Sequence, residues 1–219
     1  MQSNKKGFTL LELLIVIAIL AVLGAIVVFL LNPAETLRKA RDSQRISDLS
    51  TIKTALGIYI ASKNAPQLDG ISGTANNDCL GGAGTARMWV SDTAVTDISA
   101  SSSALTVTTS TVANNSLTSG NGWLRVNLDN LTGGSPISNM PVDPSNPSGS
   151  AVSTLSSSTL AYRYACRKSP LGFEIDAMLE SGTFGPSGED DRATKDGGNN
   201  SSYYEVGTDL TILPPGGDF

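Results

Sequence analysis

Few side chains in this sequence could do catalytic chemistry. The 219 residues include no histidine and only two cysteines, Cys79 and Cys166. Without histidine, the Ser–His–Asp and Cys–His arrangements that activate a nucleophile cannot form, and histidine-based zinc sites are excluded as well. Neither the GxxxxGK[ST] pattern of phosphate-binding loops nor the GxGxxG dinucleotide pattern is present. We expect a non-enzymatic protein, and only a hydrolase built on paired carboxylates stays open.

The two cysteines have two possible states. They can form one disulfide if the chain reaches an oxidising compartment, or they can stay reduced and buried. A bridge between Cys79 and Cys166 would close a long loop. In the chain-entropy model, such a bridge stabilises the fold by roughly 4 kcal/mol, less any strain. The membrane segment described below favours export, and therefore the disulfide.

The charge balance argues against a nucleic acid partner. The chain has 15 basic and 20 acidic residues, which gives a net charge of -5. Proteins that bind polyanions carry a basic stripe, often with interleaved aromatic residues, and no such stripe is present. We predict no nucleic acid binding.

The N-terminal region is dominated by one apolar run. Residues 13–31 contain no charged side chain, and the polar residues before them include Lys5 and Lys6. An apolar helix of about 20 residues spans a bilayer, and flanking lysines hold that end in the cytoplasm. The run is too long for a cleaved secretory signal, and no small-residue cleavage site ends it. We therefore expect a single-pass membrane protein.

One acidic residue conflicts with a simple anchor. Glu12 lies near the start of the apolar run. A carboxylate within the apolar layer costs about 2.5–3.5 kcal/mol even on the lenient insertion scale, so it needs a partner. No basic residue follows it inside the run. The alternative is that Glu12 stays hydrated at the level of the lipid headgroups.

The segment from Lys5 to Glu12, KKGFTLLE, with the apolar run after it, resembles the leader of type IV pilins and pseudopilins. The resemblance implies that prepilin peptidase cuts between Gly7 and Phe8 and N-methylates Phe8. It also implies that Glu12 pairs in the filament with the N-terminal amine of a neighbouring copy. A buried ion pair of this kind would fix the axial register, because an unpaired charge there is costly.

The resemblance also implies a life cycle and partners. The precursor would wait in the inner membrane, and an assembly platform with its ATPase would then stack it into an extracellular or periplasmic homopolymer. A type IV pilus subunit is the predicted function. A type II secretion or DNA-uptake pseudopilin is the alternative, and a single-span anchored extracellular binding domain is a further one.

A second helix is expected after the apolar run. Asn32 can cap it, Pro33 suits its first position, and Glu35 is placed as a capping-box acid. Apolar residues then recur at steps of three and four to Ser62, which indicates an amphipathic helix. Its mixed-charge face, from Arg38 to Asp48, is either solvated or docks on neighbouring subunits. The predicted parts are the leader 1–7, the membrane helix 8–31, the amphipathic half 32–63 and the exported domain 64–219.

The remainder predicts an antiparallel sheet. Candidate strands are 123–128, 162–166, 173–179 and 203–213, with a hairpin at 168–170 and a strand hint at 105–107. The block 67–121, which includes the Ser/Thr-rich stretch 99–119, predicts an exposed variable loop. A long helix packed on an antiparallel sheet is the α+β arrangement of the pilin fold. Residues 140–144 and 203–207 also look similar to major pseudopilins and small bacterial pilins.

One acidic loop is a candidate calcium site. Its acids are Glu189, Asp190, Asp191 and Asp196, and Gly197 follows. Calcium takes six to eight oxygen ligands, and a glycine turn lets them converge, but the spacing is not that of an EF-hand. Major pseudopilins bind calcium in their C-terminal loops, so the resemblance favours the site. The alternative is a solvated acidic loop.

Overall fold

The protein divides into two compact units, residues 1–38 and residues 39–219. The computed structural model describes residues 7–70, 75–92, 105–109, 114–145 and 159–214. Lys5 and Lys6 of the predicted leader lie outside these residues, as do parts of the Ser/Thr-rich stretch 99–119.

The first unit is mostly the helix α1, Leu10–Leu31. Its apolar side chains favour helix, and Thr9 caps its first turn. The helix ends at Asn32, whose φ of 37° lies in the left-handed region that terminates helices. The second helix, α2, begins at the next residue, Pro33. Asn32 also caps α2 as predicted, because its Oδ1 accepts the Glu35 N–H at 3.4 Å.

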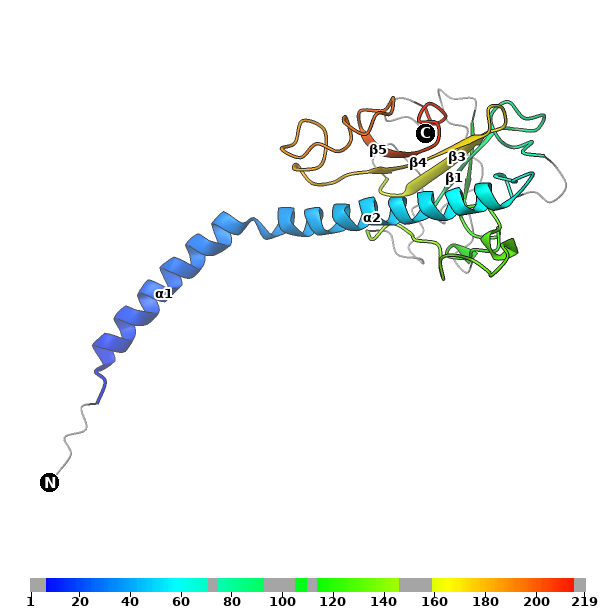
Figure 1. The fold of residues 1–219 in the computed structure, drawn as a ribbon. Coiled ribbons are helices and arrows are strands. Elements are labelled where there is room, and N and C mark those ends of the chain that lie inside the picture. The colour runs from blue at the N-terminus through cyan, green and yellow to red at the C-terminus, as the bar shows by residue number, and fades with distance from the viewer. Residues whose placement is uncertain (1–6, 71–74, 93–104, 110–113, 146–158, 215–219) are drawn as a thin grey trace. The chain divides into compact units, whose positions relative to one another are not determined.

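The predicted amphipathic helix is confirmed. The helix α2 spans Pro33–Ser62 and ends where the sequence indicated. Its apolar stripe packs on one face of the sheet and forms the main core with it (Figure 1). The buried apolar residues of this stripe are Leu49, Ile52, Ala55, Leu56 and Tyr59. The spacing of three and four that predicted the helix is therefore the spacing of its buried face.

The sheet has five strands in the order β2-β1-β3-β4-β5. The strands are β1 (Arg87–Val90), β2 (Thr106–Thr109), β3 (Tyr162–Arg167), β4 (Gly172–Met178) and β5 (Tyr203–Gly207). Strands β3, β4 and β5 pair antiparallel, and the predicted hairpin joins β3 to β4. The α+β fold class is confirmed. The edge strand β2 runs parallel to β1, so the sheet is mixed.

Two strand predictions need correction. Residues 123–128 form turns and loop, followed by the short 3-10 helix η2 at Leu128–Asn130. Apolar and polar residues alternate here because Leu124, Val126 and Leu128 are buried in the main core. A loop can place every second side chain in a core just as a strand can. The last strand is also shorter than predicted, since β5 ends at Gly207 and turns follow.

The prediction that residues 67–121 form an exposed loop is wrong for its central part. Strand β1 pairs with both β2 and β3, and its Met88 and Trp89 side chains are buried. Glycines and polar residues surround β1 in the sequence and concealed this short strand. The block therefore contributes a strand to the interior of the sheet.

A buried ionic network fixes α2 to the rest of its unit. We name Asp42, Arg45, Asp143 and Glu180 the Arg45 cluster. Arg45 is fully buried and contacts Asp42 and Asp143 at 2.7 Å and Glu180 at 2.6 Å. Asp42 in turn accepts the backbone N–H groups of Glu180 and Ser181. The prediction that this helix face is solvated or docks on other subunits is therefore wrong at Asp42 and Arg45.

The opposite face of the sheet carries charged side chains beneath the C-terminal segment. Arg163 forms a buried ion pair with Asp176 on the neighbouring strand. Beside it lies the carboxyl pair Glu174 and Glu205. Glu174 accepts the backbone N–H groups of residues 212 and 213, at 2.7 and 2.8 Å. The C-terminal segment is thus held on this face by backbone hydrogen bonds to Glu174 and by the packing of Ile212 and Leu213 in a second apolar cluster.

Candidate processing and assembly site

The predicted cleavage site lies in extended chain before α1. Gly7 and Phe8 precede the helix, and the Phe8 side chain is 84% exposed. A Cβ added at Gly7 would meet no atom within 4 Å. The folded chain therefore places no steric demand on this glycine. Any requirement for it must come from an enzyme that binds this segment.

Thr9 and Glu12 form a reciprocal capping box at the start of α1. The Thr9 hydroxyl oxygen accepts the Glu12 N–H at 3.2 Å. The Thr9 N–H and hydroxyl both donate to Glu12 Oε2, at 2.9 and 2.8 Å. The T-x-x-E spacing is the sequence signature of this box, although a capping box was predicted only at Asn32 and Glu35. Glu12 therefore has a local partner that was not predicted.

The capping box uses only one of the two Glu12 oxygens. In the described part of the chain, Glu12 hydrogen-bonds to Thr9 alone, and all these acceptor contacts are at Oε2. A carboxylate can accept about four hydrogen bonds over its two oxygens. The other oxygen thus keeps its capacity for a donor outside the chain.

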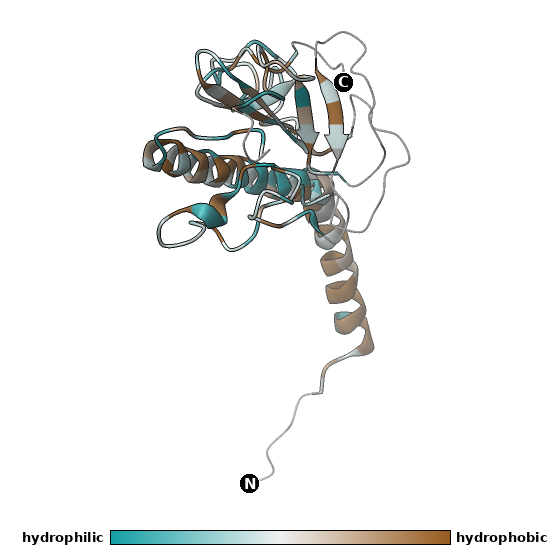
Figure 2. Ribbon diagram, turned by 90° about the vertical axis from the view of Figure 1, so that its right-hand side faces the viewer, coloured by the Kyte–Doolittle hydropathy of each residue, from teal (hydrophilic) through white to brown (hydrophobic). Residues whose placement is uncertain are grey.

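The described side chains of α1 have no intramolecular burial. Residues 10–27 are all exposed, and the helix is apolar on all sides (Figure 2). A helix that is hydrophobic all round requires a surrounding apolar phase. Leu10–Val27 is long and apolar enough to cross a membrane. The 22 residues of α1 extend about 33 Å at about 1.5 Å per residue, which matches a bilayer core of about 30 Å.

Residues 2–28 match the family model of the prokaryotic N-terminal methylation motif. The chain carries a prepilin-type N-terminus. This motif is the hallmark of type IV pilin and pseudopilin precursors, so the predicted resemblance is confirmed. The matched residues include Gly7, Phe8 and Glu12. No solved structure matches the chain.

The prepilin-type motif has direct consequences for the kind of protein. The match supports a type IV pilin-like or pseudopilin substrate of prepilin peptidase. The apolar α1 and the motif together indicate anchoring in a membrane before any assembly. The match covers only the N-terminus, so the exported domain is characterised by its structure alone.

The predicted disulfide is confirmed. Cys79 and Cys166 are bonded, across a sequence separation of 87 residues. The bond ties the loop before β1 to β3, and the Leu80 N–H beside it donates to the Cys166 carbonyl at 2.8 Å. This bridge fits a domain that works in an oxidising compartment.

The acids predicted as calcium ligands make other contacts. Asp191 accepts the backbone N–H groups of Ser187 and Thr194, both at 2.9 Å, and the Thr194 hydroxyl at 2.6 Å. The hydroxyl of Thr194, and then its N–H, lower the pKa of the Asp191 carboxyl. Asp190 pairs with Arg192, and Asp196 accepts the Glu205 N–H at 2.6 Å. Glu189 is exposed. Among the described residues, no three potential metal ligands are grouped, so calcium binding here gains no support from this geometry.

Proposed function

We propose that this protein is the structural subunit of a type IV pilus-like surface filament. The observation that carries the proposal is α1, which bears the methylation motif and exposes apolar side chains on every side. Such a helix needs lipid around it before assembly and other copies of itself afterwards. The folded unit 39–219 would form the outer part of each subunit.

The cut between Gly7 and Phe8 prepares the chain for assembly. It creates a new amine on Phe8, which prepilin peptidase then methylates. In the filament this amine meets the Glu12 carboxylate of a neighbouring copy. An acid among apolar helices is costly unless it is paired. The filament is therefore most stable in the axial register that brings Glu12 to the amine.

The assembly step needs partners, because burying α1 among other helices gains little over burying it in lipid. Lipid tails are as apolar as leucine, so helix packing and the Glu12 pair must decide the association. We assign extraction from the inner membrane to an assembly platform and its ATPase. A secretion or DNA-uptake pseudopilus would use the same steps and differ in filament length and location.

Mass spectrometry of the mature N-terminus tests the proposal. The expected result is a chain that begins with N-methylated Phe8, together with surface filaments in sheared cell fractions that contain the same chain. The change Gly7→Val should leave the folded unit intact, because a side chain here meets no atom, and should abolish cleavage. A mature chain that retains Met1 or Gln2 would instead establish the single-span anchor.

The role of Glu12 can be separated from its capping role. In Glu12→Gln the amide keeps a hydrogen-bonding oxygen for Thr9 but loses the charge. We expect both Glu12→Gln and Glu12→Leu to be cleaved normally and to lower filament yield at least tenfold. Filament mass per cell after shearing is the measurement. Wild-type yield from Glu12→Gln, with loss only in Glu12→Leu, would show that capping alone matters.

A further inference from the structure

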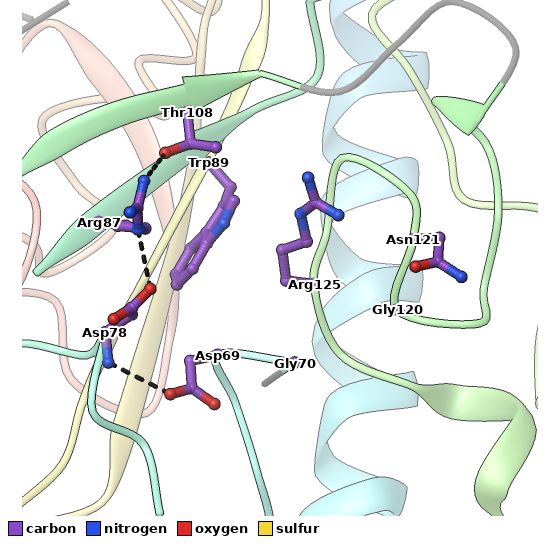
Figure 3. A pocket seen from close by; sticks show the side chains of 9 residues that line it. All are labelled: Asp69, Gly70, Asp78, Arg87, Trp89, Thr108, Gly120, Asn121 and Arg125. Atoms are coloured by element: carbon purple, nitrogen blue, oxygen red, sulfur yellow. Dashed lines mark hydrogen bonds and ion pairs between the residues drawn. The ribbon is translucent and has the colours of Figure 1, made fainter. Parts of the chain in front are cut away.

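A cavity of about 290 Å³ opens beside β1 and β2, remote in sequence from the methylation motif (Figure 3). Its lining includes Trp89 of β1 and Thr108 of β2, Asn121, and Arg125 from the segment 123–128 that was predicted as a strand. Trp89 is almost fully buried and packs against Tyr164, so it is a rigid part of the wall. The cavity is therefore built from sheet residues on one side and an ordered loop on the other.

One of the two arginines in the cavity is already neutralised. The Arg87 Nε donates to Asp78 Oδ2 at 2.8 Å, and its Nη1 donates to the Thr108 hydroxyl at 3.1 Å. The buried Asp69 carboxylate accepts the Asp78 N–H. These contacts hold the Arg87 side chain in place on one wall.

Arg125 is different, because no acid in the described part of the chain pairs with it. Its side chain is half-buried. Burial, and then the positive charge of Arg87, lower the pKa of the Arg125 guanidinium. A cation withdrawn from water without a counter-ion is costly, and here the nearby field opposes it further. The Arg125 guanidinium could therefore form an ion pair with one negatively charged group of a ligand.

The backbone at Arg125 is fixed in position. Gly70 has a φ of +69° and lies against the Arg125 carbonyl, where an added Cβ would come within 1.7 Å of the oxygen. Only glycine allows this close approach. The guanidinium is therefore presented from an anchored loop.

We propose that this cavity binds a small hydroxylated monocarboxylate, namely a sugar acid of the uronic acid class. The carboxylate pairs with Arg125, whose planar fork suits bidentate carboxylate recognition. The Thr108 hydroxyl and the Asn121 amide are available for ring hydroxyl groups. A filament with this site would recognise acidic glycans.

Charge and size select this class. Asp78 pairs with Arg87, which leaves Arg125 as the arginine of the lining that makes no ion pair within the described residues. The lining also holds the Asp69 carboxylate, so a dianion such as phosphate would be repelled by Asp69 and Asp78 more strongly than a monoanion. A bare carboxylate would leave most of the 290 Å³ unfilled. A single sugar ring with one carboxylate meets both conditions.

The experiment is ligand-observed saturation-transfer NMR with the full chain in detergent micelles. The probes are glucuronate, glucose, acetate and inorganic phosphate at equal concentrations. We expect binding of glucuronate, at least tenfold weaker binding of each other probe, and at least tenfold weaker glucuronate binding by Arg125→Gln. Lys53→Gln removes one positive charge from the α2 surface outside the cavity and should leave the affinity unchanged.

Several results would overturn the proposal. They are glucose or phosphate binding as tightly as glucuronate, no glucuronate binding by the wild type, or full affinity in a folded Arg125→Gln. Should Arg125→Gln fail to fold, Asn121→Ala replaces it, since this exposed side chain supports no core. It should weaken glucuronate binding about threefold, and unchanged affinity would count against the site.

Discussion

The two helices are consecutive in the chain but depend on opposite surroundings. In α1 every described side chain is exposed, and the intramolecular contacts that define it are the capping bonds of Thr9 and Glu12. In α2 the apolar stripe and the Arg45 cluster are buried within the folded unit. Only α2 is stabilised by its own chain. The helix α1 needs an apolar surrounding outside its own chain, such as lipid or, in the filament we propose, other copies.

Among the substitutions considered, Arg45→Ala in α2 should lower the unfolding free energy the most. Removing the central cation leaves Asp42 and Asp143 buried without it, and breaking a buried pair costs about 3–5 kcal/mol. The measurement is urea unfolding of the full chain in micelles, followed by tryptophan fluorescence. Both tryptophans, Trp89 and Trp123, lie in the folded unit, so α1 does not contribute to the signal.

The control for Arg45→Ala is Arg38→Ala. Arg38 is exposed, and within the described residues it makes one ion pair, with Glu35 at 3.8 Å. Its removal should therefore change the unfolding free energy by less than about 0.5 kcal/mol. Equal effects of the two variants would show that the buried cluster does not hold α2.

A matched pair of isoleucines sharpens the comparison. Ile52 in α2 is fully buried, whereas Ile19 in α1 is 54% exposed. Ile52→Ala should lower the unfolding free energy by about 2–5 kcal/mol through lost burial and a cavity. Ile19→Ala should leave it unchanged in the same fluorescence assay. A comparable loss from Ile19→Ala would mean that α1 is packed on its own chain.

The smallest expected effect, counted per pH unit, concerns the carboxyl pair on the far face of the sheet. Burial and the hydrogen bond with Glu205 raise the pKa of Glu174 to about 10. The folded state then keeps a proton that the unfolded chain loses above its ordinary pKa. Stability therefore falls as pH rises between about 4.5 and 10, by at most about 1.4 kcal/mol per pH unit for one proton.

Glu174→Gln removes this titration while its amide oxygen still accepts the N–H groups of residues 212 and 213. We expect the variant to gain on the wild type steadily from pH 5 to pH 9 in urea unfolding. Glu189→Gln, at an exposed acid, should keep the wild-type slope. An unchanged slope in Glu174→Gln would show that the pair is fully ionised when folded.

The helices were predictable from periodicity because one pattern runs through each of them. The helix α1 is apolar on all sides, and α2 is apolar on the one side that is buried. The β3–β4 hairpin was predictable for the same reason, since both strands alternate around a short turn. Strand β1 was not, because four residues among glycines give too little pattern. Residues 123–128 alternate without being a strand, because core burial and not pairing sets their pattern.

The functional and buried polar residues also divide into those that the sequence predicted and those that it did not. Gly7, Phe8 and Glu12 were predictable, since the motif is local and its spacing is fixed. The Arg45 cluster was not, because it joins α2 to residues 98 and more positions away, and a sequence does not display such partners. Arg125 was missed because its interest is that no acid among the described residues forms an ion pair with it, and a sequence does not show which residues meet in space.

The Arg45 cluster also has a mechanical consequence. A pull on the N-terminal helix reaches the folded unit where that unit begins, at Lys39 in α2, within one turn of Arg41 and Asp42. There Arg41 donates two hydrogen bonds to Glu180, of 2.9 and 2.7 Å. Asp42 accepts a hydrogen bond from the Ser181 N–H, just after β4. These contacts would transmit a pulling force from α2 to the segment that follows β4. The part of α2 beyond them would then bear less of the force that separates it from the core.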